Sequence, residues 1–369
     1  MDGKRAKKVR ILVITGPVEM GVMIRDVLRD IGFDAWTENE NRNDEVDIVI
    51  LPSDSIGLEL LERLGEVRVH RAMTILWLVD PLPPPGLSAR AKAIGHMITK
   101  LDWRRLLPGS WGEIMHYYFP FGREVVRLGR WICVRRLRKE IARNGKVDYL
   151  CCEDKEWVRG MKRYYRLQEY MRDGRIDYLF TTTEAKHRLL VERAYDVPFI
   201  PFGYHRSLGE YHGLERDVDV LFLGRLNSRR RAVLLRNLSA ELLAQGVKLK
   251  IVDSDCYGAE RTELLNRTKI SIDLPRVPWD FAIERFLMSM SCGALLVSEG
   301  KQSVEPFKAG VHFVQTQASD MADTILRYLR NEREREEISL AAREFVNKEV
   351  TLKRSMVQLL TKCGLWDAG

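Results

Sequence analysis

One stretch, residues 217–315, constrains the fold of this chain more than any other. It opens with the apolar run DVDVLFLG, which stops at Gly224 and passes directly into Arg225 and then Arg229–Arg231. It closes with WDFAIERFLMSMSCGALLVSEG, a pattern that predicts a helix, a turn of small residues and a second apolar strand. A strand that ends in a glycine turn and is followed by a helix N-terminus forms an anion site. With the arginines beside it, this pattern predicts a ligand that carries a diphosphate.

The length of 369 residues predicts about two domains rather than one. Hydrophobic residues make up 45% and charged residues 30% of the chain, as in a soluble globular protein with sizeable cores. No apolar run approaches the ~20 residues of a membrane span. The run ILVIT near the N-terminus is too short for a signal-peptide core and predicts a first strand instead.

The six cysteines form no CxxC pair, and no His/Cys cluster has the spacing of a zinc site. Cys151 and Cys152 are adjacent, which suits neither a disulfide bridge nor a metal site. This pattern favours a reducing, cytoplasmic compartment and predicts no bound metal.

The net charge of +8 is concentrated in one segment of the chain. Residues 123–146 contain nine Lys or Arg and two Glu, a net charge of +7. An apolar helix face is expected there, formed by Val125, Leu128, Ile132, Val134, Leu137 and Ile141. The segment is either a surface helix that covers part of the first domain or a peripheral docking site for an anionic membrane or an acidic partner. Nucleic-acid binding ranks last, because aromatic residues are scarce around Trp131.

Strands and helices alternate in the first half of the chain. Residues 10–15 predict a strand, GPVEMG a glycine loop, and residues 22–33 a helix that Gly32 ends. Further strands are predicted at DAWTE, VDIVILP and TILWLVDP, with a short helix at residues 58–64. A phospho-receiver domain is excluded, because Leu51-Pro52 stands where the third strand would end in an aspartate.

The second half repeats the alternation from the strand DVLFLG onward. A helix is predicted from Arg229 to Ala244, with Ser228 as its N-cap and Gly246 as its stop. The fold class is therefore α/β, with two Rossmann-like domains. The expected domains are residues 1–205, with a basic helical insertion around 96–175, and residues 217–348. The final segment, 349–369, predicts a helix.

Several segments resemble the GT-B glycosyltransferases. FLGRL before an arginine-rich helix resembles the opening of their donor domain, and ERFLMSMSCGALLVSEGKQSVEPFKAGVHFVQT resembles their donor-binding block. The segment IDYLFTTTEAKHRLL is similar to the family's approach to the interdomain linker. The resemblance covers about residues 180–350 and is closest to the glycosyl transferase family 1 group that includes spore maturation proteins. It implies that the two Rossmann-like domains face each other across a cleft and that the C-terminal helix crosses back to the N-terminal domain. It also implies a hexosyltransferase-like enzyme that uses a nucleotide-diphosphate sugar without a cofactor.

The donor-side residues follow from chemistry and from this resemblance together. Gly224, Arg225 and one or more of Arg229–Arg231, with Arg229 and Arg230 named first, suit a diphosphate, because guanidinium groups match phosphate oxygens. Asp253 and Ser254 follow a strand where a nucleoside base or ribose would lie. The resemblance implies acids at positions 280 and 288, where this chain has Asp280 and Met288. Glu284 is a substitute acid, Arg285 a further phosphate ligand, and Glu305 a residue beside the donor sugar.

The first domain is expected to supply the acceptor side of the cleft. Gly16, Glu19 and Gly21 belong to the glycine loop after the first strand, which would face the cleft. Asp80 is the preferred catalytic base of an inverting mechanism, with Glu19 and His96 as alternatives. Because Met288 replaces an acid, a GT-B-like binding or assembly protein without catalytic activity remains the second interpretation.

Overall fold

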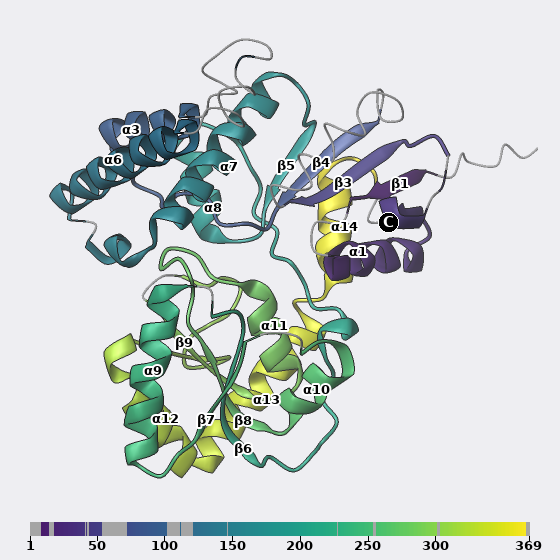
Figure 1. Ribbon diagram of the computed structural model, residues 1–369. Coiled ribbons are helices and arrows are strands. Elements are labelled where there is room, and N and C mark those ends of the chain that lie inside the picture. The colour runs from purple at the N-terminus through teal and green to yellow at the C-terminus, as the bar shows by residue number, and fades with distance from the viewer. Residues whose placement is uncertain are drawn as a thin grey trace, which may run out of the picture.

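The computed structural model describes residues 9–14, 18–40, 42, 44–53, 72–101, 111, 121–145, 147–226, 228–253, 256–300 and 303–366. Two five-stranded sheets form the centres of two α/β domains, one above the other in Figure 1. Every strand pair in both sheets is parallel. The predicted fold class is confirmed. Within the described ranges, every helix is too short or too polar to span a bilayer.

The first sheet has the strand order β2-β1-β3-β4-β5. Its strands are buried on both faces, as expected for parallel strands that read as continuous apolar runs. Helix α1 (Val18–Asp30) packs on one face and α7 (Asp154–Arg172) on the other. The strands are β1 (Arg10–Val13), β2 (Asp34–Thr37), β3 (Ile48–Ser53), β4 (Met73–Leu78) and β5 (Tyr178–Thr181).

Helix α1 begins earlier than its apolar periodicity predicted. It starts at Val18, so Glu19 and Gly21 both lie inside the helix, and the expectation that they belong to a loop is wrong. Glu19 lies in the first turn of α1, where a carboxylate interacts favourably with the helix dipole. Gly16 and the helix predicted at residues 58–64 lie outside the described residues.

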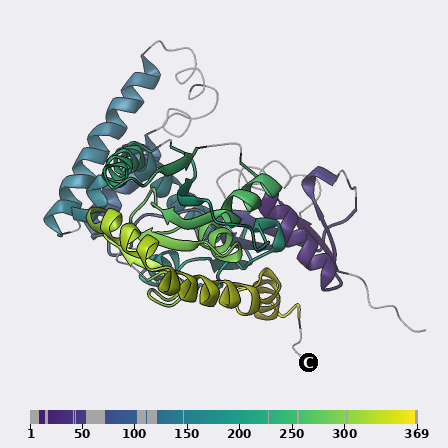
Figure 2. The ribbon, with the colours of Figure 1, turned by 90° about the horizontal axis from the view of Figure 1, so that it is seen from below.

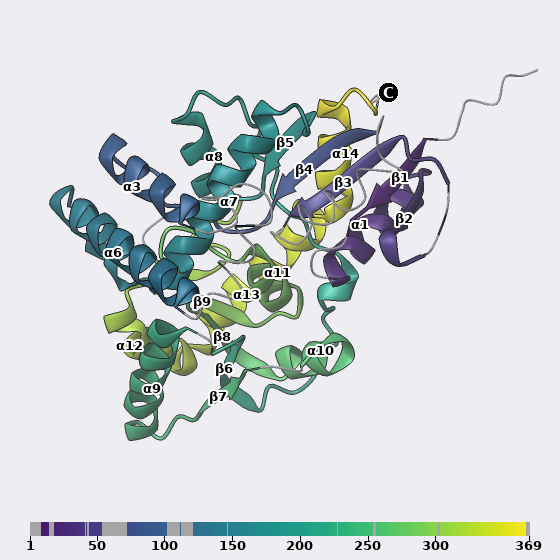
Figure 3. The same ribbon diagram turned by 45° about the horizontal axis from the view of Figure 1, so that its top comes forward.

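A layer of helices lies beside the first sheet (Figure 3). It contains α3 (Ala89–Lys100), α6 (Gly122–Arg143) and α7, and α3 contacts both of the others. The helix predicted in the segment 123–146 exists as α6, but its apolar face was assigned wrongly in its first half. Val125, Leu128 and Ile132 are exposed, whereas Cys133 and Leu137 are buried against α3 and α7. The short helix α8 (Glu184–Val191) follows β5.

The second sheet has the order β10-β9-β8-β6-β7. Its strands are β6 (Val218–Leu223), β7 (Leu249–Val252), β8 (Thr268–Asp273), β9 (Leu295–Glu299) and β10 (Val314–Thr316). The helices are α9 (Arg229–Ala244), α10 (Gly258–Asn266), α11 (Ile283–Ser291), α12 (Met321–Arg330) and α13 (Glu332–Lys348). The predicted bounds of α9 are confirmed: the Ser228 hydroxyl accepts from the Arg231 N–H, and Gly246 follows with a φ of 76°.

The last helix, α14 (Leu352–Lys362), returns to the first domain and packs against α1, as Figure 1 shows in yellow. The backbone of Tyr204 exchanges two hydrogen bonds with this segment, accepting from Leu352 N at 2.7 Å and donating to Val350 O at 2.6 Å. Gly203 lies so close to the Thr351 backbone that a Cβ would stand 2.3 Å from its carbonyl carbon. The two connections between the domains, one near Tyr204 and one near Leu352, therefore lie side by side.

Candidate functional site

A cleft lies between the carboxyl ends of the two sheets. Its central pocket has a volume of about 330 Å³ and is lined from both domains. The first domain contributes residues that follow β4 and β5, including Asp80 and Thr182. The second contributes the segments after β6 and β8 and the start of α11. Ligands of open α/β sheets bind outside the carboxyl ends of the strands, so the pocket has the position expected of a binding site.

The turn after β6 lies at the point where the order of the second sheet reverses, between β6 and β8. Gly224 ends this strand with a φ of 151°, a conformation that L side chains rarely adopt. A Cβ on Gly224 would lie 2.9 Å from the guanidinium of Arg285. Glycine is therefore required for the turn and for the close approach of Arg285. Arg225, Glu284 and Arg285 line both the central pocket and an adjoining one of about 230 Å³.

Four guanidinium groups line the central pocket, those of Arg225, Arg231, Arg276 and Arg285. Arg225 is exposed, and Arg231 is buried and donates to Leu274 O at 2.8 Å and Arg225 O at 2.9 Å. Burial, together with the nearby charge of Arg285, lowers the pKa of Arg231 to about 9. Arg285 pairs with the buried carboxylate of Asp273 at the end of β8. A charge environment that lowers the pKa of an arginine would favour an anion in this pocket.

The N-terminus of α11 also borders the pocket, through Ala282, Glu284 and Arg285. Free backbone N–H groups and the helix dipole make such a terminus favourable for phosphate. Burial raises the pKa of Glu284, which favours its protonated form in the folded protein. A protonated carboxyl can donate a hydrogen bond as well as accept one. Met288 lines the adjoining pocket one turn further along.

Asp280 lines the central pocket, but an interdomain ion pair engages its carboxylate. Lys186 on α8 lies 3.0 Å from Asp280, and both side chains are only 1% exposed. The lysine also donates to the hydroxyls of Thr182 and Thr183, and the second oxygen of Asp280 accepts from the Phe281 N–H at 2.9 Å. The structure therefore directs the Asp280 carboxylate toward the first domain. Nothing in the sequence near Lys186 indicated this partner.

Arg229 and Arg230 lie near the cleft but have partners of their own. The backbone N–H of Arg229 donates to the carboxylate of Glu153, so a residue of the first domain occupies the N-terminus of α9. Arg230 pairs with Glu299 and donates to Pro275 O at 3.1 Å. Neither arginine lines the central pocket, whereas their neighbour Arg231 does. Within the run of three arginines, the structure places the third in the pocket.

Three further donor-side predictions have different outcomes. Asp253 lines the adjoining pocket and accepts a hydrogen bond from the Leu226 N–H, which joins the turns after β6 and β7. Glu305 is exposed and does not line either pocket of the cleft. Ser254 lies outside the described residues. The structure thus brings Asp253 together with Arg225, Glu284 and Arg285, and leaves Glu305 apart from them.

Two acids of the first domain face the cleft. Asp80 lines the central pocket, with one carboxylate oxygen 3.2 Å from the Arg163 guanidinium of α7. Glu19 reaches across to the second domain, where Arg261 of α10 lies 3.3 Å from its carboxylate. His96 is an exposed residue of α3 that contacts the ring of Tyr165, and it does not line the cleft pockets. Asp80 is therefore the candidate base whose position fits best.

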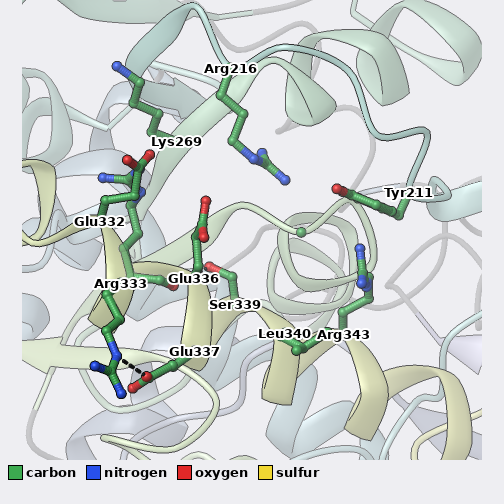
Figure 4. A pocket seen from close by; sticks show the side chains of 12 residues that line it. Tyr211, Arg216, Lys269, Glu332, Arg333, Glu336, Glu337, Ser339, Leu340 and Arg343 are labelled. Atoms are coloured by element: carbon green, nitrogen blue, oxygen red, sulfur yellow. Dashed lines mark hydrogen bonds and ion pairs between the residues drawn. The ribbon is translucent and has the colours of Figure 1, made fainter.

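A larger pocket, of about 890 Å³, lies elsewhere on the second domain (Figure 4). It is lined by Arg216, which precedes β6, and by Lys269 at the start of β8, so it borders the amino ends of the strands. Charges of both signs line it, and Arg333 pairs with Glu337 at 2.9 Å within it. Despite its size, this position is unlike that of ligand sites in parallel sheets, and the cleft remains the candidate site.

Among the comparisons with known proteins, the family match falls on the second domain and the last helix. A family model described as Glycosyl transferase-like matches residues 228–361, less than half of the chain. No curated protein matches. Among solved structures, AviGT4, a glycosyltransferase involved in avilamycin A biosynthesis, is 11% identical with a TM-score of 0.49, over 96% of this chain and 97% of that chain. HepE from Anabaena, solved with UDP-glucose, is 11% identical with a TM-score of 0.47, over 97% of this chain and 100% of that chain.

Other solved structures are similar over a smaller part of their length. TarM is 13% identical with a TM-score of 0.43, and the chain covers 45% of the length of TarM. At such identities and scores, these likenesses carry no argument about function. The fold class rests on the architecture itself: two parallel α/β domains facing across a cleft, with the last helix crossing back, which is the GT-B arrangement. The narrower resemblance to spore maturation proteins stays a prediction.

Proposed function

We propose that this protein is a glycosyltransferase that moves a sugar from a nucleotide-diphosphate donor to an acceptor. The observation that carries the proposal is the convergence of Arg225, Arg231 and Arg285 at the switch point of the second sheet, beside the N-terminus of α11. The Glycosyl transferase-like match over residues 228–361 includes Arg231, Arg285 and the whole of α11. Guanidinium groups and a helix N-terminus suit a diphosphate better than an uncharged ligand.

The proposed donor lies with its diphosphate between Arg225 and the start of α11. Arg231 is held by two backbone carbonyls, so its charge is fixed in place before a ligand binds. The nucleoside would extend into the adjoining pocket, where Asp253 and Glu284 provide carboxyl groups for hydroxyls or a base. Glu284 takes the role that an acid at position 288 would have. A thioether at Met288 accepts hydrogen bonds only weakly.

In the proposed reaction, the bond between the sugar carbon and the diphosphate breaks and negative charge builds on the leaving phosphate. Fixed positive groups that face this charge lower the barrier, because they need no reorganisation as the reaction proceeds. Asp80 is the proposed base for an acceptor hydroxyl in an inverting reaction, since it faces the pocket from the opposite domain. Its ion pair with Arg163 holds the carboxylate in place.

The proposed enzyme uses no cofactor and no metal, with the nucleotide sugar as co-substrate. Within the described ranges, no group of three His, Cys, Asp or Glu side chains is placed to hold a metal ion. The cations near the diphosphate are instead the guanidinium groups that line the pocket. Turnover that persists in excess EDTA is the expected result, and activity restored only by a divalent ion would contradict this part of the proposal.

We also propose a cytoplasmic setting for this activity. None of the six cysteines, all of which the structure describes, is in a disulfide. Free thiols persist in a reducing compartment, which supports the proposal. Titration of the protein from its native cells under denaturing conditions should find all the thiols reactive, and disulfides would count against the proposal.

A second candidate function is a GT-B-like binding or assembly protein without catalysis. Two observations favour it: Met288 stands in the place of an expected acid, and the Asp280 carboxylate is engaged by Lys186. Such a protein would bind a nucleotide sugar and release it unchanged. Measurements of donor binding and of donor consumption on the same sample distinguish the two functions.

The test uses a panel of nucleotide-diphosphate sugars, assayed for release of the nucleoside diphosphate with and without candidate acceptors. Arg225→Ala should lower turnover by about tenfold or more, because the exposed guanidinium contacts the leaving group without a structural role. Arg236→Ala is the matched control, an exposed arginine on α9 that does not line the cleft. A fall of less than tenfold for Arg225→Ala would count against the assignment, and binding without turnover would favour the second function.

A further inference from the structure

Helix α6 carries an apolar stripe on its outer side that the domain core does not use. Phe121, just before the helix, is 68% exposed, and Val125, Leu128 and Ile132 are 52%, 57% and 40% exposed. Their spacing of three or four residues places them on one face of the helix. Such a row of exposed apolar side chains is typical of a docking surface rather than of an ordinary protein surface.

The opposite face of α6 packs against α3 and α7 and holds the helix on the first domain. Cys133, Leu137 and Ile141 are at most 5% exposed and belong to a cluster with residues of α3 and α7. At 100° per residue, these buried positions point away from the stripe of Phe121 and Leu128. The outer stripe is therefore not needed to hold the helix in place. Figure 2 shows α6, the long blue helix, at the edge of the molecule.

The same outer face becomes cationic in the second half of the helix. Arg135, Arg136, Lys139 and Arg143 are exposed there and continue the line of the apolar stripe. Trp131 lies beside the stripe, 45% exposed, with the Arg135 guanidinium 4.5 Å from its ring centroid. Tryptophan is enriched where a protein meets the interface of a bilayer. The outer face thus combines apolar, aromatic and cationic side chains along one helix of 22 residues.

Acidic side chains do little to offset this charge. Residues 123–146 contain only two acids, Glu124 and Glu140, against nine basic residues, and Asp154 of α7 pairs with Arg138 at 2.8 Å. Glu124 pairs with Arg127 at 2.9 Å, and Glu140 is close to Arg90 and Arg143 at 3.7 and 3.8 Å. The partner of this face must therefore be anionic as well as able to accept apolar side chains.

We propose that the outer face of α6 docks the protein on an anionic lipid bilayer. The side chains of Phe121, Val125, Leu128 and Ile132 enter the region between headgroups and acyl chains, while the cations of the second half bind anionic headgroups. A bilayer fits better than an acidic protein. The apolar stripe is a convex helix face, which can enter a bilayer directly, whereas a protein partner would need a complementary groove. This docking does not depend on the proposed transferase activity.

The experiment is flotation of the full chain with phosphatidylcholine vesicles that contain or lack phosphatidylglycerol. Binding is expected only to the anionic vesicles and is expected to weaken at high salt. Arg135→Gln/Arg136→Gln should weaken binding by about 25-fold, since a cation near an anionic surface contributes about fivefold in affinity. Phe121→Ser/Leu128→Ser should weaken it by at least ~tenfold through the loss of apolar burial.

Two matched controls accompany these variants. Leu243→Ser changes a 66% exposed leucine on α9, and Arg236→Gln changes an exposed arginine on the same helix. Both should bind vesicles as the unaltered protein does. Because all of the substituted side chains are exposed, thermal unfolding should be unchanged. If one variant pair failed to fold, the other pair would still test the proposal.

Three results would overturn the proposal. The first is no binding to anionic vesicles by the unaltered protein, which would leave an acidic protein as the partner of α6. The second is equal binding to neutral and anionic vesicles. The third is that the α6 variants bind as tightly as the α9 controls.

Discussion

The buried ion pair between Lys186 and Asp280 should be the most sensitive polar contact between the two domains. At a separation of 3.0 Å, the Coulomb attraction is about 5–6 kcal/mol for an effective dielectric constant near 20. Desolvation of two charges that are 1% exposed offsets much of this gain. The pair therefore adds little net stability, but the loss of either partner leaves the other charge buried and uncompensated.

Lys186→Met and Asp280→Asn should each lower the free energy of unfolding by about 3–5 kcal/mol. The double variant should lie within about 1 kcal/mol of the unaltered protein, because no unpaired charge remains. Asparagine at position 280 can still accept from the Phe281 N–H that now bonds Asp280.

Urea titration followed by circular dichroism measures these energies. Lys353→Met, at an exposed position on α14, is the control and should change the free energy by no more than about 0.5 kcal/mol. Single variants that cost less than about 1 kcal/mol would refute the reasoning, because a buried lone charge is expected to cost more. A double variant as unstable as the sum of the two singles would refute it as well.

Three further predictions concern contacts near the cleft and the crossing point. Trp279→Phe removes a buried hydrogen bond of 2.7 Å from Nε1 to Leu82 O and should lower the free energy of unfolding by about 1–3 kcal/mol; an unchanged urea midpoint would contradict this. Gly203→Ala places a Cβ 2.3 Å from the Thr351 backbone, so it should lower the free energy of unfolding by about 3 kcal/mol and speed hydrogen exchange in α14. An unchanged free energy of unfolding would show that the backbone is not tightly packed where the chain crosses between the domains. A hydrogen bond from the adjacent thiol lowers the pKa of Cys151 to about 6. Its thiolate forms above that pH, so alkylation by iodoacetamide should be half-maximal near pH 6 and be lost in Cys151→Ser, whereas a midpoint near the ordinary thiol value of about 8.5 would contradict the environment described.

Most strands could be predicted from the sequence, because parallel strands buried on both faces read as short, continuous apolar runs. The runs at residues 10–13 and 218–223 are of this kind, and both form central strands. Helix α1 starts four residues before the predicted residue 22, because its apolar periodicity begins only after Gly21. Glycine inside a helix is disfavoured but is overridden here by the packing of the helix on the sheet.

The apolar face of α6 could not be predicted from periodicity. The helix has two apolar stripes, one at Val125, Leu128 and Ile132 and another at Cys133 and Leu137, on opposite sides. A pattern with two stripes has no single hydrophobic direction, so only the packing of α3 and α7 decides which side is buried. The exposed stripe that resulted is the basis of the membrane proposal.

The position of the site was predictable in outline, and its polar partners were not. Because the carboxyl ends of parallel strands gather at one edge, Arg225 and Asp253 were both assigned to the donor side, and both border the cleft. The partners that engage Asp280 and the N-terminus of α9 come from the other domain, and Glu153 is separated from Arg229 by 76 positions. Local sequence patterns carry no information about such contacts.

The central claim, that the cleft binds a diphosphate through Arg225 and its neighbours, is tested most directly by isothermal titration calorimetry with UDP, GDP, ADP and dTDP. At least one of these should bind the unaltered protein and Arg236→Ala with equal affinity. Arg225→Ala should weaken that binding by about 10- to 100-fold, as expected for the loss of a charge-assisted contact of about 1.5–3 kcal/mol. Absence of binding by all four, or equal affinity for Arg225→Ala and the unaltered protein, would contradict the account.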